Sequence, residues 1–394
     1  MDGQLYLFID EPITVGEIFE AYYDCRKHKR TSPSALDFEV YLENNLFRLL
    51  DEINSWSYKP RPYNCFIIDR PAVREVFAAS FRDRIVHHLV VNAINPLLEK
   101  RLIYDCYACR VGKGTHFAIE RLRHFMASST SNWKEEAWCL KLDISSFFAS
   151  IDRNLLYERL KEYLSRYYVR DNYRIIMYLI EKILLTDPTE NVRFISPREK
   201  WKKLAPAKSL FNCPSGKGLP IGNLTSQVFA NFYMSPLDHY IKHDLGIRMY
   251  GRYVDDFFLI HRDKEYLKEC LSRIREFLSL ELHLSLSSKK VILQRVNHGV
   301  KFLGVMIEPG HTNMIRRTQE SLKRVISDYN ERARRHKLSR WEREKLLSSV
   351  NSYLGIMRHY NTFNRRVELV NMLSPCVLSR FSLHSGYHKI TLKS

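Results

Sequence analysis

Long uncharged apolar runs are missing from this sequence. No window approaches the roughly 18 apolar residues that a membrane-spanning helix needs, so no membrane span is expected. The first twelve residues, MDGQLYLFIDEP, carry acids and lack a basic segment before an apolar core, so no secretory signal peptide is expected. Internal repeats and low-complexity tracts are also missing, which argues against a repeat architecture.

A framework of paired cysteines is missing as well. The chain has eight cysteines, and only Cys106 and Cys109 form a CxxC. No second pair, and no histidine pair at zinc-finger spacing, completes a zinc site, and the stretch around Tyr107 looks structural, so a metal or redox role for this pair is not expected. Without a disulfide framework, a reducing cytoplasm is the expected location.

Charge and length are what the sequence does offer. Lysine and arginine total 62 against 44 acidic residues, which gives a net charge of +18 and a pI of about 9.5. Such a basic excess indicates a polyanionic partner, most often nucleic acid, although it could serve solubility alone. A chain of 394 residues favours several subdomains. We expect a helical extension at 1–59, a central domain at 60–310 and a basic helical region at 311–394.

Apolar periodicity predicts an α+β fold. Strands are expected at 65–69, 75–79, 138–144 and 291–307, a hairpin at 248–261, and an exposed loop at 187–218. Helices are expected at 14–56, 83–100, 116–126, 153–166, 172–185, 224–243, 264–279 and 318–373.

The most specific feature is a pair of adjacent aspartates, Asp255 and Asp256, inside the string Tyr-Val-Asp-Asp between two apolar strands. A hairpin turn normally prefers Asn-Gly or Asp-Gly, so two acids at this crest are unexpected. Neighbouring like charges raise each other's pKa, and either water or a divalent cation relieves the repulsion. Alone, such a pair is more often a solvated turn than a metal site.

A third acid changes that balance. Asp143 ends the apolar segment Trp138–Ile144, and Asp255 follows 112 residues later (255 − 143). The two acids meet if their strands are neighbours in one sheet. Nucleotidyl transfer needs this arrangement, because two Mg²⁺ ions about 3.5–4 Å apart stabilise the attacking and leaving oxygens. We predict Asp143 and Asp255 as bridging ligands, the Ile144 carbonyl as a further ligand, and Asp256 as a ligand or its near neighbour. Mn²⁺ is the alternative ion.

The order of further strings resembles the palm of reverse transcriptases. Five strings occur in the family's order, and they cover about residues 60 to 310: Asp143 with Phe148 (motif A), Gly218–Gln227 (motif B), Tyr253–Asp256 (motif C), Lys289-Lys290 (motif D) and Phe302-Leu303-Gly304 (primer grip). The resemblance implies a right-hand polymerase fold with fingers, palm and helical thumb. It also implies RNA-directed DNA polymerase activity, with template RNA, the RNA–DNA duplex and dNTPs as partners.

Motif B indicates a subgroup. Retroviral, group II intron and retron enzymes carry Gln before the Gly and end in Ser-Pro, whereas this chain has Ile221 before Gly222 and Gln227 in place of the Pro. The variant is similar to enzymes of diversity-generating retroelements, as are the strings Tyr107–His116 and Phe81–Arg84. That likeness implies a mutagenic enzyme that misincorporates opposite template adenines. It also implies a small basic accessory variability protein, which could be oligomeric, as partner.

The resemblance assigns a dNTP-binding set, which is Arg70, Arg74, Phe148, Ile221, Gly222 and Gln227. Arginine forks suit triphosphate oxygens, and a ring under the sugar would clash with a 2′-hydroxyl. A solvated hairpin tip and a core phenylalanine are the structural alternatives. Ile221 cannot hydrogen-bond near the templating base as Gln could, so mispairs lose less relative to correct pairs. Lys290, or Lys289, is a candidate general acid for the leaving pyrophosphate.

A nucleic-acid-binding set completes the hypothesis: Arg110, Lys113, Phe302, Leu303, Gly304, Arg332, Arg334, Arg335 and Lys337. The basic helices from residue 318 suit phosphate contacts, which give affinity without sequence choice. One competing reading is another bacterial reverse transcriptase of the retron, group II intron-like or phage-defence type. A second is an inactive RNA-binding scaffold, against which the intact Asp143, Asp255 and Asp256 argue.

Overall fold

The structure is a computed structural model of the chain, and it describes residues 11–27, 29, 31–69 and 72–393. The chain divides into two compact units. The first comprises Met1–Val111, Lys141–Phe258 and Lys268–Val291, and the second comprises Gly112–Leu140, Leu259–Leu267 and Ile292–Ser394. The three segments expected from the sequence stay a prediction. Among the described residues, no helix has the length and apolar character needed to cross a bilayer.

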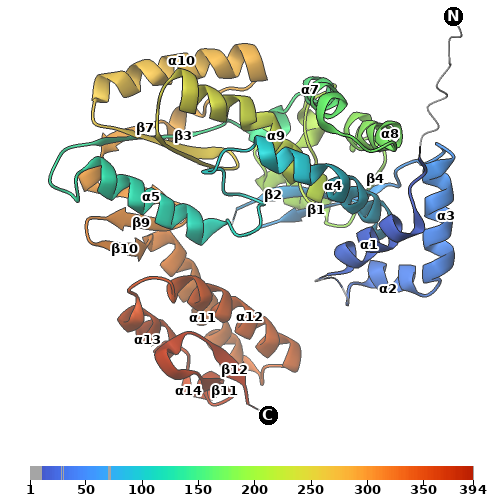
Figure 1. The fold of residues 1–394 in the computed structure, drawn as a ribbon. Helices are drawn as coiled ribbons and strands as arrows, with labels where there is room; N and C mark the ends of the chain where they lie inside the picture. Colours follow the sequence, from blue (N-terminus) through green and yellow to red (C-terminus); the bar gives the residue numbers. More distant parts are fainter. Residues whose placement is uncertain (1–10, 28, 30, 70–71, 394) are drawn as a thin grey trace, which may run out of the picture. The chain divides into compact units, whose positions relative to one another are not determined.

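Helices open the described chain, as the periodicity predicts (Figure 1). They are α1 (Val15–Arg26), α2 (Pro33–Glu39) and α3 (Leu42–Asn54). Thr14 begins α1 with a capping box, in which its hydroxyl accepts from the Glu17 backbone and Glu17 accepts from the Thr14 backbone. The buried residues Leu46, Leu49 and Ile53 recur at helical spacing along α3.

A three-stranded sheet follows, in the order β2-β1-β4. β1 (Tyr63–Ile68) pairs antiparallel with β2 (Arg74–Ala78), and β4 (Val192–Phe194) pairs parallel with β1. The first two strands confirm the prediction, and the segment 187–218, expected as an exposed loop, is largely exposed but also contains β4 and three short 3-10 helices. Glu75 explains the difference, because its buried carboxylate accepts from Trp201 Nε1, Ser209 Oγ and the Leu210 backbone. These bonds tie the segment to β2.

A four-stranded sheet in the order β5-β6-β3-β7 carries the acidic strings. Its strands are β3 (Trp138–Asp143), β5 (Met249–Tyr253), β6 (Asp256–His261) and β7 (Ile292–Arg295). The four central residues of β6 are all buried, as expected of a strand covered on both faces. β6 lies between β5 and β3, so the two acid-bearing strands are neighbours, as the sequence predicts.

The remaining helices of this central part follow the predicted pattern closely. They are α4 (Phe81–Arg101), α5 (Thr115–Ser129), α6 (Phe147–Ser150), α7 (Arg153–Tyr167), α8 (Tyr173–Leu185), α9 (Leu224–His239) and α10 (Lys264–Leu282). A π-helical turn, Tyr240–Asp244, follows α9. α9 is buried over most of its length, which makes it a rigid support for what is attached to it.

The C-terminal part is mainly helical from residue 316, as predicted. Before it, β8 (Val300–Phe302), β9 (Val305–Glu308) and β10 (His311–Met314) form an antiparallel sheet. The helices are α11 (Arg316–Arg335), α12 (Arg340–Met357), α13 (Phe363–Asn371) and α14 (Pro375–Leu378). The last 21 residues, for which the sequence predicts nothing, include a hairpin of β11 (Phe381–Leu383) and β12 (Ile390–Leu392). Leu322, Ile326, Leu346, Val350 and Leu354 build a core for this part.

Candidate active site

Two strand ends bring the predicted acids to one place. β3 ends at Asp143, and β6 starts at Asp256, directly after Asp255. The backbone N–H of Ile144 donates to the Asp255 carbonyl at 3.3 Å, which fixes the register between these strand ends. The sequence hypothesis requires this neighbourhood of Asp143 and the Asp255-Asp256 pair.

The turn that carries the acid pair is strained. Val254 has a φ of 58°, in the left-handed region that β-branched residues avoid. Such a conformation costs about 1–3 kcal/mol and persists only where surrounding contacts hold it. A tight turn with Asn-Gly would avoid this cost, so the chain keeps an unfavourable residue at the position before its acid pair.

Burial and mutual repulsion shape the charges. Burial, and next the charge of Asp143, raise the pKa of Asp255, while Lys290 and Arg74 oppose the shift. Burial raises the pKa of Asp256 to about 6, against the effect of Lys141. Ionised carboxylates here are therefore costly without a cation, which is how metal-binding acids behave when their ion is absent.

Two lysines supply positive charge to the acids. Lys290 Nζ lies 2.6 Å from Asp143 Oδ2, and Lys141 Nζ lies 3.1 Å from Asp256 Oδ2. Burial lowers the pKa of Lys290, but the hydrogen bond to Asp143 and the charges of the three acids outweigh it and raise the pKa overall. Lys290 is therefore protonated at neutral pH, as a general acid must be. It is Lys290, rather than Lys289, that reaches the acids.

The donor set suits a divalent cation. Asp256 Oδ1 is buried and has no hydrogen-bond partner, which leaves a carboxylate oxygen for another ligand. Mg²⁺ prefers such oxygens and takes its other ligands from water and substrate phosphates. Within the described residues, no three acids, histidines or cysteines already surround one point. The side chains of Asp143, Asp255 and Asp256, with the Ile144 carbonyl, are the groups that would hold the metal.

Phe148, the predicted sugar contact, lies on the short α6 after motif A. Its ring is half-buried, whereas the neighbouring Phe147 is buried. Phe147 is therefore a core residue, and Phe148 is partly accessible. The Leu219 N–H donates to the Phe148 carbonyl at 2.7 Å. That bond connects motif A to the start of motif B.

Motif B is bound to the neighbouring strand β2. The Phe77 N–H donates to the Ile221 carbonyl at 2.8 Å, and the Asn223 side chain donates to the Phe77 carbonyl and accepts from the N–H of Ala79, which directly follows the strand. Gly222 has a φ of 121°, and a Cβ there would lie 2.7 Å from Val76 Cγ1, so only glycine fits.

Gln227 is exposed on the first turn of α9, and its Oε1 accepts from Cys109 Sγ at 2.8 Å. The structure thus shows a partner for one cysteine of the CxxC.

The predicted arginines differ in availability. Arg74 is exposed at the start of β2, and its positive charge lowers the pKa of Asp255, against the effect of burial. Arg70 lies outside the described residues. Arg110 already donates to Glu99 at 2.7 Å and to the Ile103 and Cys106 carbonyls. A template contact by Arg110 would break these bonds, so the structure favours a structural role for it.

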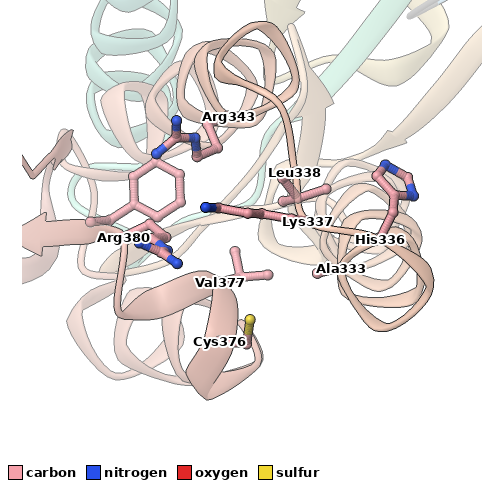
Figure 2. A pocket seen from close by; sticks show the side chains of 9 residues that line it. Ala333, His336, Lys337, Leu338, Arg343, Cys376, Val377 and Arg380 are labelled. Atoms are coloured by element: carbon pink, nitrogen blue, oxygen red, sulfur yellow. The ribbon is translucent and has the colours of Figure 1, made fainter.

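The other predicted nucleic-acid residues belong to the second unit. Phe302 is buried, and Leu303 and Gly304 form a left-handed turn between β8 and β9, with φ of 46° and 90°. Lys113 lies over the ring of Phe117. On α11, Arg332 pairs with Asp328, Arg335 pairs with Glu331, and Arg334 is exposed. Lys337, which follows this helix, lines a cavity (Figure 2).

Sequence reasoning missed three residues that shape the site. Lys141 neutralises Asp256, Asn223 fastens motif B, and Arg252 is fully buried behind the acidic turn. An arginine inside an apolar strand was the available signal for the last. Lys141 offered one too, because it interrupts an apolar strand two residues before Asp143.

Adjacent strands that present three carboxylates beside two lysines have the donor set of a metal-dependent nucleotidyltransferase. Residues 70–307, more than half of the chain, match the family reverse transcriptase (RNA-dependent DNA polymerase). The chain belongs to this family, which confirms the predicted enzyme class and the α+β right-hand polymerase fold. Members of the family generally use divalent metal ions.

Two curated relatives are similar in sequence. "Protein YkfC" of Escherichia coli (strain K12) is 23% identical over 316 residues, which cover 71% of this chain and 74% of that protein. "Putative COX1/OXI3 intron 1 protein" of Saccharomyces cerevisiae is 21% identical over 209 residues, which cover 52% of this chain and 21% of that protein.

The solved structures that match are distant. Apo telomerase from Candida tropicalis is 12% identical with a TM-score of 0.49, and the match covers 81% of this chain and 57% of that one. A C-terminally truncated form gives 13% identity and a TM-score of 0.47, with 67% and 59% covered. This chain thus spans less than two thirds of the telomerase chains, and likeness at this level does not bear on function.

Proposed function

We propose that this chain copies a template RNA into cDNA by two-metal nucleotidyl transfer. The observation that carries the proposal is the meeting of Asp143 with Asp255 and Asp256 at neighbouring strand ends, with an unpartnered buried oxygen on Asp256. Family membership supports the same activity. Template RNA, the RNA–DNA duplex and dNTPs are the proposed partners, Mg²⁺ the proposed ion, and the cytoplasm the proposed location.

The chain's own groups have separable roles in this reaction. Two bound Mg²⁺ ions would lower the barrier by stabilising the attacking 3′-oxygen and the leaving oxygen. Asp143 and Asp255 hold the metal-binding oxygens at fixed strand ends. Arg74 meets the triphosphate, and the Phe148 ring stands against a 2′-hydroxyl. Lys290 donates a proton to the leaving pyrophosphate, for which its raised pKa keeps it charged.

The proposed subtype is the adenine-mutagenic enzyme of a diversity-generating retroelement, acting with a small basic accessory protein. Its support is the Ile221-Gly222 sequence in motif B, because Ile221 offers no side-chain hydrogen bond to a base. Its backbone carbonyl is bound to Phe77, so the Ile221 position is fixed with respect to β2. A second candidate is an intron-type reverse transcriptase, which the likeness to the yeast intron protein favours.

The activity test is dNTP incorporation on a primed RNA with Mg²⁺. Asp255→Asn should lower the rate about a thousandfold, because several kcal/mol of transition-state stabilisation are lost at about 1.4 kcal/mol per tenfold. Asp244→Asn, which changes an exposed acid, is the matched control and should match wild type. Equal incorporation by the Asp255→Asn variant and wild type would overturn the proposed site.

The subtype test is the error spectrum of the cDNA. A diversity-generating enzyme, assayed with its accessory protein, should misincorporate far more often opposite adenine than opposite the other template bases. An even error spectrum in that assay would favour the intron-type candidate instead.

A further inference from the structure

A buried ion pair lies behind the acidic turn and has no role in the mechanism above. Arg252, in the middle of β5, is 0% exposed, and so is Asp238 on α9. The pair is bidentate, with Nε 2.7 Å from Asp238 Oδ1 and Nη2 2.6 Å from Oδ2. Tyr250 donates its hydroxyl to the same carboxylate at 2.6 Å. Burial opposes the charge of Arg252, yet Asp238 raises its pKa, so the arginine stays charged.

The third nitrogen of the Arg252 guanidinium forms a hydrogen bond to the turn before Asp255. Arg252 Nη1 donates to the Val254 carbonyl at 3.0 Å and to Asn231 Oδ1 at 3.3 Å. Val254 is the strained residue directly before Asp255, and its left-handed conformation needs a contact that holds it. A charged donor bonded to the carbonyl of that residue is such a contact.

The same guanidinium connects the turn to α9, the helix that begins within motif B. Asn231 and Asp238 lie seven residues apart, so they share one face of α9, whose first turn carries Gln227. Gly251 keeps the strand close to its neighbours, because a Cβ there would collide with Tyr107 Oη and lie 2.8 Å from Phe258 Cζ. The backbone of Arg252 is also held by Asp105 and Tyr107 on both sides.

We propose that Arg252 is a positioning residue for the catalytic acids: its guanidinium holds the Val254 carbonyl at a fixed distance from α9, and so sets where Asp255 points. The inference rests on the proposed polymerase function. A purely structural role is the alternative, since buried ion pairs often add little to stability and can be replaced by apolar residues of similar volume. That property separates the two roles experimentally.

The main variant replaces the whole polar cluster by Arg252→Met, Asp238→Leu and Tyr250→Phe together. It leaves none of the three groups charged and unpaired, so the fold should keep its melting temperature within a few degrees. The Val254 carbonyl nevertheless loses its donor. We expect kcat to fall about 10- to 100-fold with the dNTP KM within about threefold, because small misplacements of reacting groups cost about that much.

Arg252→Lys is the second variant. It keeps a positive charge for Asp238 but lacks the planar guanidinium that also donates to the Val254 carbonyl, so kcat should fall in the same way. Tyr250→Phe alone removes a hydroxyl that does not touch the turn, and its kcat should stay near wild type. Arg82→Met is the matched control, because Arg82 forms a similar buried cluster with Asp83, which also accepts from Tyr58. It should lower stability and leave the kcat of the folded enzyme unchanged.

The outcomes are distinguishable. A triple variant with wild-type stability and wild-type kcat overturns the positioning role, and so does a Lys variant with wild-type kcat if the triple variant does not fold. A loss of kcat in Arg82→Met equal to that in Arg252→Lys overturns it too, because destabilisation alone would then explain both. The polymerase function itself is refuted by a different result: wild type shows no dNTP incorporation, and Asp255→Asn is indistinguishable from it.

A separate observation concerns the C-terminal helices. A cavity of about 40 Å³ is lined by Lys337, Arg343, Arg380 and His336 over an apolar floor that includes Phe381, and no acid lines it. In Figure 2, Lys337, Arg343 and Arg380 extend into this cavity.

These three bases differ from their neighbours. Nearby basic side chains each lie within bonding distance of an acid: Arg332 of Asp328, Arg335 of Glu331, His336 of Glu342 and Arg340 of Glu344. Within the described part of the chain, Lys337, Arg343 and Arg380 have no such acid, and Arg343 Nε is a buried donor without a hydrogen-bond partner. Three positively charged side chains around one cavity, together with the Arg343 Nε donor that has no acceptor, indicate an anion-binding site.

We infer that this cavity binds a phosphate group through Arg343, Arg380 and Lys337. A phosphodiester of bound nucleic acid and free inorganic phosphate are the two sources. The test compares wild type with the double variant Arg343→Gln and Arg380→Gln, using RNA–DNA duplex affinity against salt concentration and melting with inorganic phosphate. Lys389→Gln, which changes an exposed base away from the cavity, is the control.

For a nucleic-acid phosphate, the double variant should lower the magnitude of the salt slope by about one, and the control should not. For free phosphate, the variant should lose the melting shift that inorganic phosphate gives to wild type, with the salt slope unchanged. An unchanged slope together with an unchanged melting shift would falsify the phosphate site.

Discussion

Asp256→Asn is expected to stabilise the metal-free protein while it abolishes incorporation. The reason lies in the buried position of this carboxylate, which has one oxygen against Lys141 and the other without a partner. Asn is a neutral group of the same shape, so it resembles the protonated acid. The change removes a buried charge that folding must accommodate and also removes a ligand oxygen that the reaction needs.

The magnitude follows from the pKa of Asp256. Burial raises it from 3.8 to about 6, so the folded protein binds this proton more tightly than the unfolded chain does. The associated stability is fully present below about pH 3.8 and is lost as the pH rises through 6. At about 1.4 kcal/mol per pKa unit, the loss at pH 7.5 amounts to about 3 kcal/mol, and at pH 5 to about half of that. Asp256→Asn should recover an amount of this order.

The assay is denaturant unfolding in EDTA at pH 7.5 and pH 5, for wild type and Asp256→Asn. The variant should be more stable at both values, with the larger difference at pH 7.5. Added Mg²⁺ should stabilise wild type more than the variant, because a ligand stabilises the state that binds it. A variant that is less stable than wild type at pH 7.5 in EDTA would show that the Lys141 ion pair outweighs burial, and would refute the reasoning.

Three further changes probe the nucleotide-binding side. Phe148→Val should lower discrimination against rNTPs about 10- to 100-fold, since it removes the bulk opposed to a 2′-hydroxyl; the ratio of kcat/KM for dNTP and rNTP measures this. Ile221→Gln should lower misincorporation opposite adenine by about two orders of magnitude, at about 1.4 kcal/mol per decade, and sequenced cDNA with an unchanged error rate contradicts this account of infidelity. Gly222→Ala should lower the melting temperature and raise the dNTP KM, because the added Cβ would collide with Val76 and the backbone φ at this position is positive. A wild-type KM would show that Gly222 has no part in nucleotide binding.

Patterns local to the chain predicted much of the fold. The alternation and apolar runs around Asp143 and Tyr253–Asp256 identify two buried strands, and acids at strand ends meet when the strands are neighbours. The helices of the C-terminal part follow from their periodicity. In these places, local pattern and tertiary packing agree.

The segment 187–218 shows which features a local pattern does not predict. Residues 187–218 are predicted as an exposed loop because they are polar and contain proline, and they are largely exposed, but the short elements within them are held by distant residues, which include β1 and Glu75, more than a hundred residues earlier in the chain. The strain at Val254, and the arginine that holds it, are also invisible in a sequence, because strain is a property of backbone angles. Likewise, no composition rule distinguishes Arg110, bound by Glu99, from an arginine that is available to a template.

The two ends of α9 suggest why a nucleotide-binding motif and a catalytic turn so far apart in sequence can act as one site. The N-terminal turn of this buried helix follows Gly222, whose neighbour Ile221 is bonded to β2, while Asn231 and Asp238 further along hold the arginine that reaches Val254. A displacement of the helix along its axis would move both contacts together. A substitution at Asp238 should therefore alter not only kcat but also the balance between correct and incorrect nucleotides, whereas a change at Lys290, which contacts Asp143 and is not attached to α9, should alter kcat alone.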